Sequence, residues 1–327
     1  MKMVKDDIVQ ESPVIKPMNG EKAIATDVVK IFQRRANKYL IALGIVLLVG
    51  VIAYMLISKR ELDALLLTLS KDHHMFYWMV LVGFLAEIVA GSMGMGYGVI
   101  CTTILLILNI SPPIISASIH SAESFTTAAG SISHYKFGNV NKKLTKLLAI
   151  PAVIGAVVGA LLLTYVGERY AKMTKPVIAV YTMYLGLRIL QNAFAKKTGN
   201  GNGGTPKKKT NITVLGLVGG FIDSFGGGGW GPLVTGTFIK NGRTPRYVVG
   251  SSTIAKFILT FASAVTFLFT VGIHHWNIVA GLLIGGIITA PFSAMLTARL
   301  PMKKMFIAVG VVVIAMSLIT IYRAIFL

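Results

Sequence analysis

Long apolar runs alternate with short basic segments along most of the chain. Several runs approach the roughly 20 apolar residues that an α-helix needs to cross a bilayer. The pattern therefore predicts an all-α protein that crosses a membrane many times. The runs expected in the membrane are 39–57, 76–108, 114–135, 144–166, 176–194, 212–239, 247–271, 276–298 and 305–326.

Glycine interrupts two of these runs. Five glycines and a tryptophan fill residues 226–231, and each glycine in a helix interior costs about 1 kcal/mol. The helix must therefore open there, which is tolerated in a membrane only where the backbone is buried in protein or lines a wet cavity. Pro232 suits the first turn of a new half-helix. The N–H groups and the dipole at that helix start favour an anion.

A weaker copy of the glycine cluster lies at residues 91–98. Two broken apolar segments in corresponding halves of a chain indicate the binding site of a transporter. Tyr97 and Trp230, one in each cluster, stand 133 positions apart, and so do Glu123 and Lys256. Further pairs at offsets of 132 to 134 positions are Pro113 and Pro245, Gly138 and Gly272, and Gly159 and Ser293. The near-constant offset indicates an internal duplication.

Composition narrows the class of protein. Of the 327 residues, 54% are hydrophobic and 13% are charged, which excludes a soluble globule. The net charge of +20 would suggest nucleic acid for a soluble protein. Here Lys and Arg lie in short loops between apolar runs, as expected for cytoplasmic loops, so no nucleic-acid partner is predicted. The single cysteine, Cys101, excludes an internal disulfide and a cysteine-based metal cluster.

The same pattern divides the chain into five parts. Residues 1–25 are polar and are expected to form a disordered tail. Residues 26–75 hold one extra N-terminal transmembrane helix and an external loop. Residues 76–195 and 212–327 are the two transporter repeats, and residues 196–211 form a cytoplasmic linker rich in Gly and Lys.

Loop charges predict the orientation of the chain. If each glycine-broken segment returns as a hairpin, the basic loops are cytoplasmic and the nearly uncharged turns at 109–113 and 274–275 are external. Repeat one then starts outside and repeat two inside, so the repeats are inverted. We expect a cytoplasmic N-terminus in the cell membrane. The basic residues placed in the cytoplasm include Lys136, Lys142, Lys143, Lys146, Lys240, Arg243, Arg246, Arg299, Lys303 and Lys304.

Ionisable residues within membrane spans are costly and are functional candidates. Glu123 and Lys256 occupy equivalent positions, so they should lie close together if both spans line the centre. We expect Lys256 to contact an anionic substrate, and Glu123 to carry a proton with His120 beside it. We also expect the substrate, and not Glu123, to compensate the charge of Lys256. The alternative is an ion pair that only joins two helices.

Other polar residues have more ordinary interpretations. Asp223 precedes the second glycine cluster and is expected to act as an N-cap or loop brace. Glu87 has no assigned role. His120, Glu123 and His134 offer metal-ligand chemistry, but no HExxH motif accompanies them, so no metal or cofactor is predicted.

These motifs together resemble the TauE/SafE sulfite exporter family. The resemblance covers about residues 76–327 and depends on the Gly-aromatic-Gly pattern at Tyr97 and Trp230. Repeat one departs from it, because Met93 and Met95 interrupt its glycines and Val99 stands where repeat two has Pro232. The resemblance implies a secondary transporter of sulfite or small organosulfonates, and not an enzyme.

The sequence thus predicts two inverted repeats, each a glycine-broken hairpin plus three helices, with the anion between two half-helix ends. The alternatives are an intramembrane metal enzyme using His120, Glu123 and His134, or an anion channel. The lipid bilayer is the expected surrounding, and a homodimer stays open. The predicted substrate contacts are Gly94, Gly96, Tyr97, Gly98, Gly227, Gly228, Gly229, Trp230, Gly231, Ser251, Ser252, Thr253 and Lys256.

Overall fold

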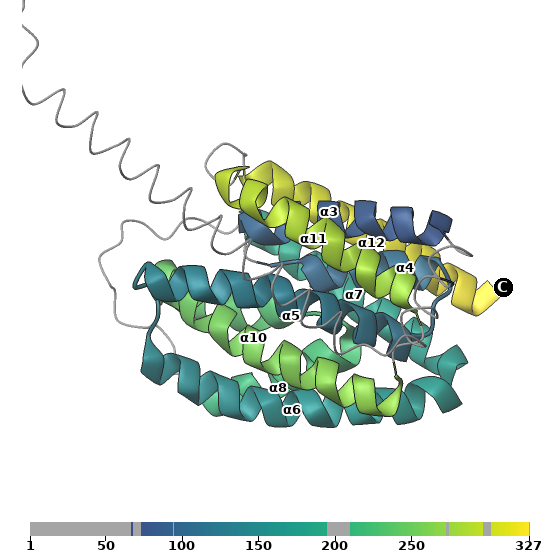
Figure 1. Cartoon of the computed structure of the whole chain (residues 1–327), viewed down its shortest axis with the longest axis horizontal. Coiled ribbons are helices and arrows are strands. Elements are labelled where there is room, and N and C mark those ends of the chain that lie inside the picture. Colours follow the sequence, from purple (N-terminus) through teal and green to yellow (C-terminus); the bar gives the residue numbers. More distant parts are fainter. Residues whose placement is uncertain are drawn as a thin grey trace, which may run out of the picture. The chain divides into compact units, whose positions relative to one another are not determined.

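The computed structural model describes residue 67 and residues 73–93, 95–194, 210–272, 275–296 and 302–326. The predicted tail, the extra N-terminal helix, most of the linker and Gly94 lie outside these residues. The described part is all-helical (Figure 1). Its helices are α3 (His73–Met93), α4 (Tyr97–Ile107), α5 (Pro112–Lys136), α6 (Lys142–Arg169), α7 (Ala171–Phe194), α8 (Ile212–Gly226), the π-helical turn η1 (Gly231–Thr235), α9 (Gly236–Lys240), α10 (Pro245–Thr270), α11 (Trp276–Leu296) and α12 (Met302–Phe326).

Five of the described helices, α3, α6, α7, α10 and α12, are long and apolar enough to cross a membrane. The shorter apolar helices are α4, α8 and the first part of α11. α5 was also predicted as a span and has sufficient length, but Ser, Thr, His and Glu lower its hydropathy. Many of these polar side chains are buried because α5 packs against α10 and α11. A helix enclosed by protein can carry them without facing lipid.

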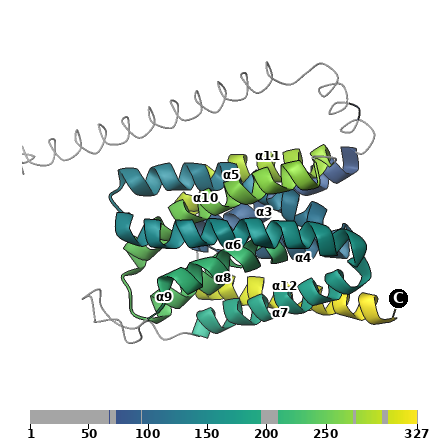
Figure 2. The ribbon, with the colours of Figure 1, turned by 90° about the horizontal axis from the view of Figure 1, so that it is seen from below.

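Four pairs of helices make up most of the packing. α3 lies along α11, α6 along α8, α5 along α10 and α7 along α12 (Figures 1 and 2). Glycine permits the close approach in two of these pairs. A Cβ atom on Gly83 would lie 2.5 Å from the carbonyl oxygen of Leu282, and one on Gly216 would lie 2.9 Å from that of Leu148. Small residues at such contacts let helix backbones approach within a membrane.

Both glycine clusters break their helices, as predicted. Between α3 and α4, Gly96 has a φ of 112°. α8 ends at Gly226, and the following Gly227, Gly228 and Gly229 have φ angles of 71°, 155° and 144°. These positive angles are accessible to glycine and strained for other residues.

The second broken segment returns to the end of the bundle from which it starts. The side chain of Asn241, directly after α9, donates a hydrogen bond to the hydroxyl of Thr210, two residues before α8, at 2.6 Å. α8 and the helix that follows the break therefore form a hairpin.

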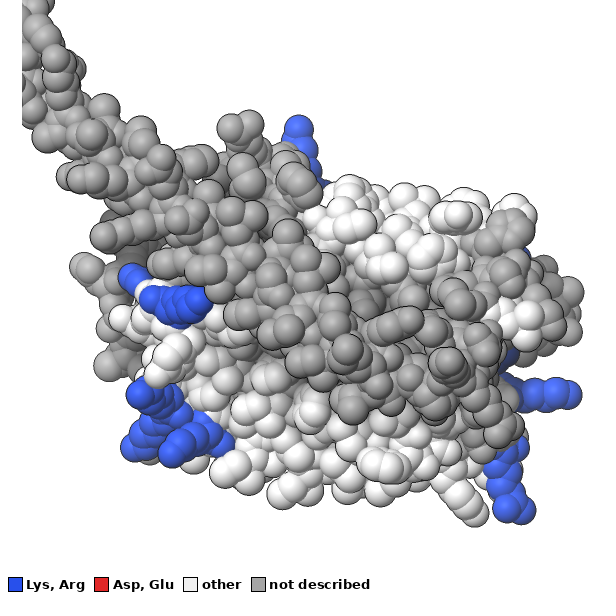
Figure 3. Space-filling view, viewed as in Figure 1, with Lys and Arg blue, Asp and Glu red and all other residues white. Residues whose placement is uncertain are grey.

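The Lys and Arg side chains visible in Figure 3 gather toward the two ends of the helices. The described surface that is visible between these ends is white. An uncharged belt between two basic ends is what a membrane-spanning bundle presents to lipid.

Candidate functional site

The two glycine loops touch each other inside the bundle. A Cβ atom on Gly98 would lie 2.5 Å from the carbonyl oxygen of Gly227 and 2.8 Å from the Cα of Gly228. The hydroxyl of Thr102 donates a hydrogen bond to the same Gly227 oxygen at 2.8 Å. Two predicted site segments, far apart in the sequence, are thus in direct backbone contact. An ion can enter between Gly98 and Gly228 only if the loops separate.

A tyrosine from α7 holds the second loop from its other side. The hydroxyl of Tyr181 donates a hydrogen bond to the carbonyl oxygen of Gly228 at 2.7 Å. A Cβ atom on Gly229 would lie 1.9 Å from that hydroxyl oxygen. The loop therefore needs glycine at these positions both for its backbone angles and for the space that its neighbours leave.

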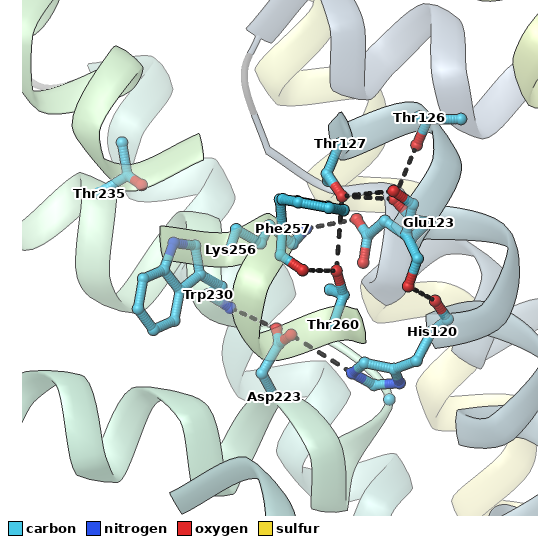
Figure 4. A network of polar contacts seen from close by, with 12 residues as sticks. His120, Glu123, Thr126, Thr127, Asp223, Trp230, Thr235, Lys256, Phe257 and Thr260 are labelled. Atoms are coloured by element: carbon cyan, nitrogen blue, oxygen red, sulfur yellow. Dashed lines mark hydrogen bonds and ion pairs between the residues drawn. The ribbon is translucent and has the colours of Figure 1, made fainter. Parts of the chain in front are cut away.

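Asp223 closes the second loop. Its Oδ1 accepts a hydrogen bond from the backbone N–H of Trp230 at 2.7 Å (Figure 4). The carboxylate thus sits at the start of the second half-helix, where the helix dipole favours negative charge. The predicted brace role of Asp223 is confirmed.

Trp230 is fixed by its side chain as well. It is 1% exposed, and its indole N–H donates to the hydroxyl oxygen of Ser252 at 2.8 Å. The hydroxyls of Ser252 and Thr235 are hydrogen-bonded at 2.6 Å. Tyr97, in the first loop, is equally buried, and its hydroxyl donates to the carbonyl oxygen of Leu282 at 3.2 Å. Both aromatic residues therefore anchor their half-helices in the core.

The three predicted hydroxyl donors on α10 do not converge on the loop. Ser252 reaches Trp230, but Ser251 accepts a hydrogen bond from the backbone N–H of Asn141 at 2.8 Å, at the start of α6. The hydroxyl of Thr253 donates to the carbonyl oxygen of Val249 at 2.9 Å within its own helix. Helix rotation separates the three side chains, because consecutive residues on a helix face different directions.

Lys256 and Glu123 form an ion pair in the core, which confirms the expected proximity (Figure 4). The side chain of Lys256 is 16% exposed and that of Glu123 is 4% exposed. The expectation that only a substrate compensates Lys256 is corrected here, because the carboxylate of Glu123 already does so. Glu87 is also buried and lies within electrostatic range of both groups.

His120 joins this network through Asp223. The Nε2 atom of His120 lies 3.5 Å from the Oδ2 atom of Asp223, and both side chains are fully buried. These two atoms have no other hydrogen-bond partner among the described residues. The Nδ1 atom of His120 lies 2.8 Å from the carbonyl oxygen of Ser116. The chain of contacts therefore runs from α5 through Asp223 to the start of the second half-helix.

The metal-site alternative finds no support in the side-chain geometry. Across the described ranges, no three His, Cys, Asp or Glu side chains lie close enough to hold a metal ion. His120 faces Asp223, and Glu123 faces Lys256. His134 belongs to the last turn of α5, well along the helix from both.

Sequence reasoning missed two residues that hold the loops, Thr102 and Tyr181. Neither stands in a glycine cluster or breaks an apolar pattern, so no feature of the sequence distinguishes them from ordinary helix residues. The pairing of His120 with Asp223 was also missed, although each residue was noted separately.

Comparison with known proteins gives a consistent result. The sequence model of the family described as "Sulfite exporter TauE/SafE" matches residues 79–320. The chain is 37% identical over 233 residues to the probable membrane transporter protein YtnM of Bacillus subtilis (strain 168), covering 70% of this chain and 77% of that protein. It is 23% identical over 226 residues to the probable membrane transporter protein YdhB of the same organism, covering 68% and 91%. No solved structure matches the chain significantly.

Proposed function

Because the chain belongs to the TauE/SafE sulfite exporter family, we propose that it is a secondary transporter that exports small sulfur-containing oxyanions, either sulfite or small organosulfonates. The observation that carries this proposal is the hydrogen bond that the carboxylate of Asp223 accepts from the backbone N–H of Trp230. The start of the second half-helix already holds a negative group, which is the chemistry that a transported oxyanion requires.

The proposed anion site lies where the two glycine loops meet. Once the loops separate, an anion can approach the backbone N–H groups of residues 96–98 and 227–231 closely. All of these residues are glycine except Tyr97 and Trp230, so few side chains stand in the way. Lys256 supplies the nearby positive charge, which it shares with Glu123. Ser252 stays in the proposed site through its contact with Trp230, whereas Ser251 and Thr253 take part only if α10 moves.

Helix packing supports the proposal of two inverted repeats. If α3 to α7 correspond in order to α8 to α12, then α3 is equivalent to α8, and α6 is equivalent to α11. A twofold axis between the repeats then relates the contact of α3 with α11 to the contact of α8 with α6. Both contacts are present. The contacts of Gly83 with Leu282 and of Gly216 with Leu148 are related in the same way, by offsets of 133 and 134 positions. α5 then packs on its counterpart α10, and α7 on α12.

Two side-chain pairs fit an axis that passes between α5 and α10. Glu123 pairs with Lys256, and the hydroxyls of Thr127 and Thr260 are hydrogen-bonded at 3.4 Å. The members of each pair stand 133 positions apart. Residues at equivalent positions meet each other only near a symmetry axis, so both contacts support a twofold relation between the repeats.

We propose the cytoplasmic membrane as the location, with the end of the bundle that carries the 136–142 loop inside the cell. This end collects more basic residues than the other, and the hairpin of α8 and α9 starts and ends there. The positive-inside rule favours this orientation.

A flux assay on the purified protein in proteoliposomes tests the function. We expect sulfite, isethionate or methanesulfonate to leave the vesicles at a rate that saturates with concentration, and chloride to leave no faster than from empty vesicles. Linear dependence of the rate on concentration would indicate an anion channel instead. The matched control is Lys142→Ala, an exposed lysine at the start of α6, which should retain the flux.

A further inference from the structure

We propose that His120 and Asp223 form a proton-binding site that couples proton uptake to anion binding at the neighbouring glycine loop. This inference depends on the proposed function, because it assigns the coupling ion to the same site. The coupling proton is thereby assigned to Asp223 and His120, whereas the sequence alone predicted that Glu123 carries it.

The hydrogen bonds of His120 set the number of protons in the pair. The carbonyl oxygen of Ser116 can only accept a hydrogen bond, so the Nδ1 atom 2.8 Å away carries a hydrogen. If the pair held no further proton, the lone pair of Nε2 would face an anionic Oδ2 at 3.5 Å in a fully buried site. Such an arrangement leaves a buried charge without compensation. One proton therefore lies on Nε2 or on Oδ2.

Asp223 connects this proton to the proposed anion site. Its Oδ1 accepts a hydrogen bond from the backbone N–H of Trp230, the residue that directly follows Gly229 in the second loop. An oxyanion that arrives at this helix start competes with the carboxylate for the same donor and repels it. The repulsion is relieved if Asp223 becomes a neutral carboxylic acid, since the anion is then the only negative group on the half-helix.

The charges around the pair favour uptake of a proton from solvent over a shift within the pair. Lys256 on α10 already pairs with Glu123 on α5, and Glu87 on α3 adds a third carboxylate nearby. Tyr181 on α7 lies within electrostatic range of Asp223, and the hydroxyls of Ser224 on α8 and Ser263 on α10 are hydrogen-bonded to each other. None of these groups supplies an uncompensated positive charge. A bound monoanion therefore needs one added proton to remain neutral in a medium of low dielectric constant.

The proton step can be written in full. Before binding, the pair is an imidazolium and a carboxylate, with one proton shared along the Nε2–Oδ2 axis. On binding, the N–H bond at Nε2 breaks and an O–H bond forms on Oδ2, which neutralises Asp223. A proton from hydronium or from the acid form of the buffer then binds Nε2 and restores the imidazolium, leaving water or the buffer base in the solvent. The pair gains one proton, and the anion brings one negative charge.

A pocket close to one side of His120 offers a starting point for the entry of this proton. A pocket between α5, α10 and α11 is lined by Ser118, Ser121, Phe267 and His275, among others. The ring of Phe267 lies next to that of His120, with centroids 6.1 Å apart. A small movement of this one aromatic ring would connect the pocket to the imidazole.

The experiment is isothermal titration calorimetry of the full chain with isethionate and methanesulfonate, which stay ionised over the whole range of pH. It is run in two buffers that contain no sulfonate and differ in ionisation enthalpy, imidazole and succinate. We expect uptake of one proton for each anion bound. The affinity should then fall about tenfold for each unit of pH once the pair no longer holds a second proton.

Asp223→Asn is the decisive variant. The asparagine oxygen can still accept from Trp230, and its amide can donate to Nε2, so the variant removes the charge of Asp223 and keeps His120 neutral. The bound anion then lacks the proton that compensates its charge. We therefore expect Asp223→Asn to bind the sulfonates more weakly than the wild type, with no proton uptake and with an affinity that no longer depends on pH. Glu87→Gln is the comparison, because Glu87 is a buried carboxylate outside the pair, and this variant should retain the uptake of one proton for each anion bound.

Each result has one meaning. Proton uptake in the wild type that disappears in Asp223→Asn supports the inference. Sulfonate binding without proton uptake, uptake that persists in Asp223→Asn, or uptake that disappears in Glu87→Gln overturns the inference and leaves the proposed function intact. If neither sulfonate binds, sulfite at a pH where it is fully dianionic replaces them. Absence of all binding overturns the proposed function and this inference with it.

Discussion

Glu123 on α5 and Lys256 on α10, which stand 133 positions apart, form an ion pair in the core of the bundle. Removal of one partner from a buried pair leaves the other charge without compensation, at a cost of about 3–5 kcal/mol. We therefore expect Lys256→Met to lower the thermal stability strongly. The double variant Lys256→Met with Glu123→Gln should recover most of the loss. Thermal unfolding in detergent measures both.

The same variants test the role of Lys256 in binding. We expect both the single and the double variant to lose sulfonate affinity, because each lacks the ammonium group. An unchanged affinity in the stable double variant would eliminate Lys256 as an anion contact. An unchanged stability of Lys256→Met would show that the pair is absent from the resting protein.

Gly229 provides a second prediction. Its φ of 144° strains any other residue by roughly 1–3 kcal/mol, and an added Cβ atom would also meet the hydroxyl of Tyr181. We expect Gly229→Ala to lower the melting temperature, and Tyr181→Phe in the same chain to restore part of it by removing that oxygen. Gly242→Ala is the control, since Gly242 also has a positive φ but no atom within 4 Å of the added carbon. Equal losses at Gly229 and Gly242 would exclude the contact with Tyr181.

The contact between Thr127 and Thr260 predicts a cross-link. Their hydroxyl oxygens lie 3.4 Å apart, so cysteines at both positions place two sulfur atoms in range of a disulfide. With a protease site inserted in the 196–209 linker, oxidation should keep the two halves together on a non-reducing gel after cleavage. Cysteines at Thr126 and Thr260 serve as the register control and should not cross-link. The native Cys101 is fully buried and should not interfere.

Orientation in the membrane is the fourth prediction. We expect a cysteine at Lys142 to react with an impermeant reagent only from the cytoplasmic side, and one at Lys172 only from outside. Both lysines are exposed. Lys142 is the first residue of α6, and Lys172 lies in the first turn of α7, beyond the other end of α6. Reaction of the cysteine at position 142 from outside would contradict the hairpin orientation and the inverted repeats derived from it.

The positions of the helix breaks could be predicted from the sequence because glycine acts locally on the backbone. Gly96 and Gly227 adopt the positive φ angles that open the two segments. The proximity of Glu123 and Lys256 could be predicted for a different reason, since a repeat offset carries information across the whole chain. The glycines determine where the helices break, and the repeat offset indicates which residues are equivalent, so both features could be predicted from the sequence.

The contacts around the second loop could not be predicted in this way. Which of Ser251, Ser252 and Thr253 faces Trp230 depends on the rotation of α10, and only Ser252 reaches the indole. Tyr181 reaches Gly228 because α7 packs where it does. Such contacts depend on how whole helices pack against one another, and this packing cannot be predicted from a single sequence.

The glycine-to-glycine contact between the loops also bears on how fast the protein can work. No side chains interlock between Gly98 and Gly228, so the loops can part without unpacking a core. The described hydrogen bonds that reach the glycines of the second loop from other helices come from Thr102 and Tyr181. At about 0.5–1.5 kcal/mol each, their loss adds only a small barrier. Turnover should therefore be limited by the larger motion of the helices, on the microsecond to millisecond timescale of such motions, and not by release of the loops.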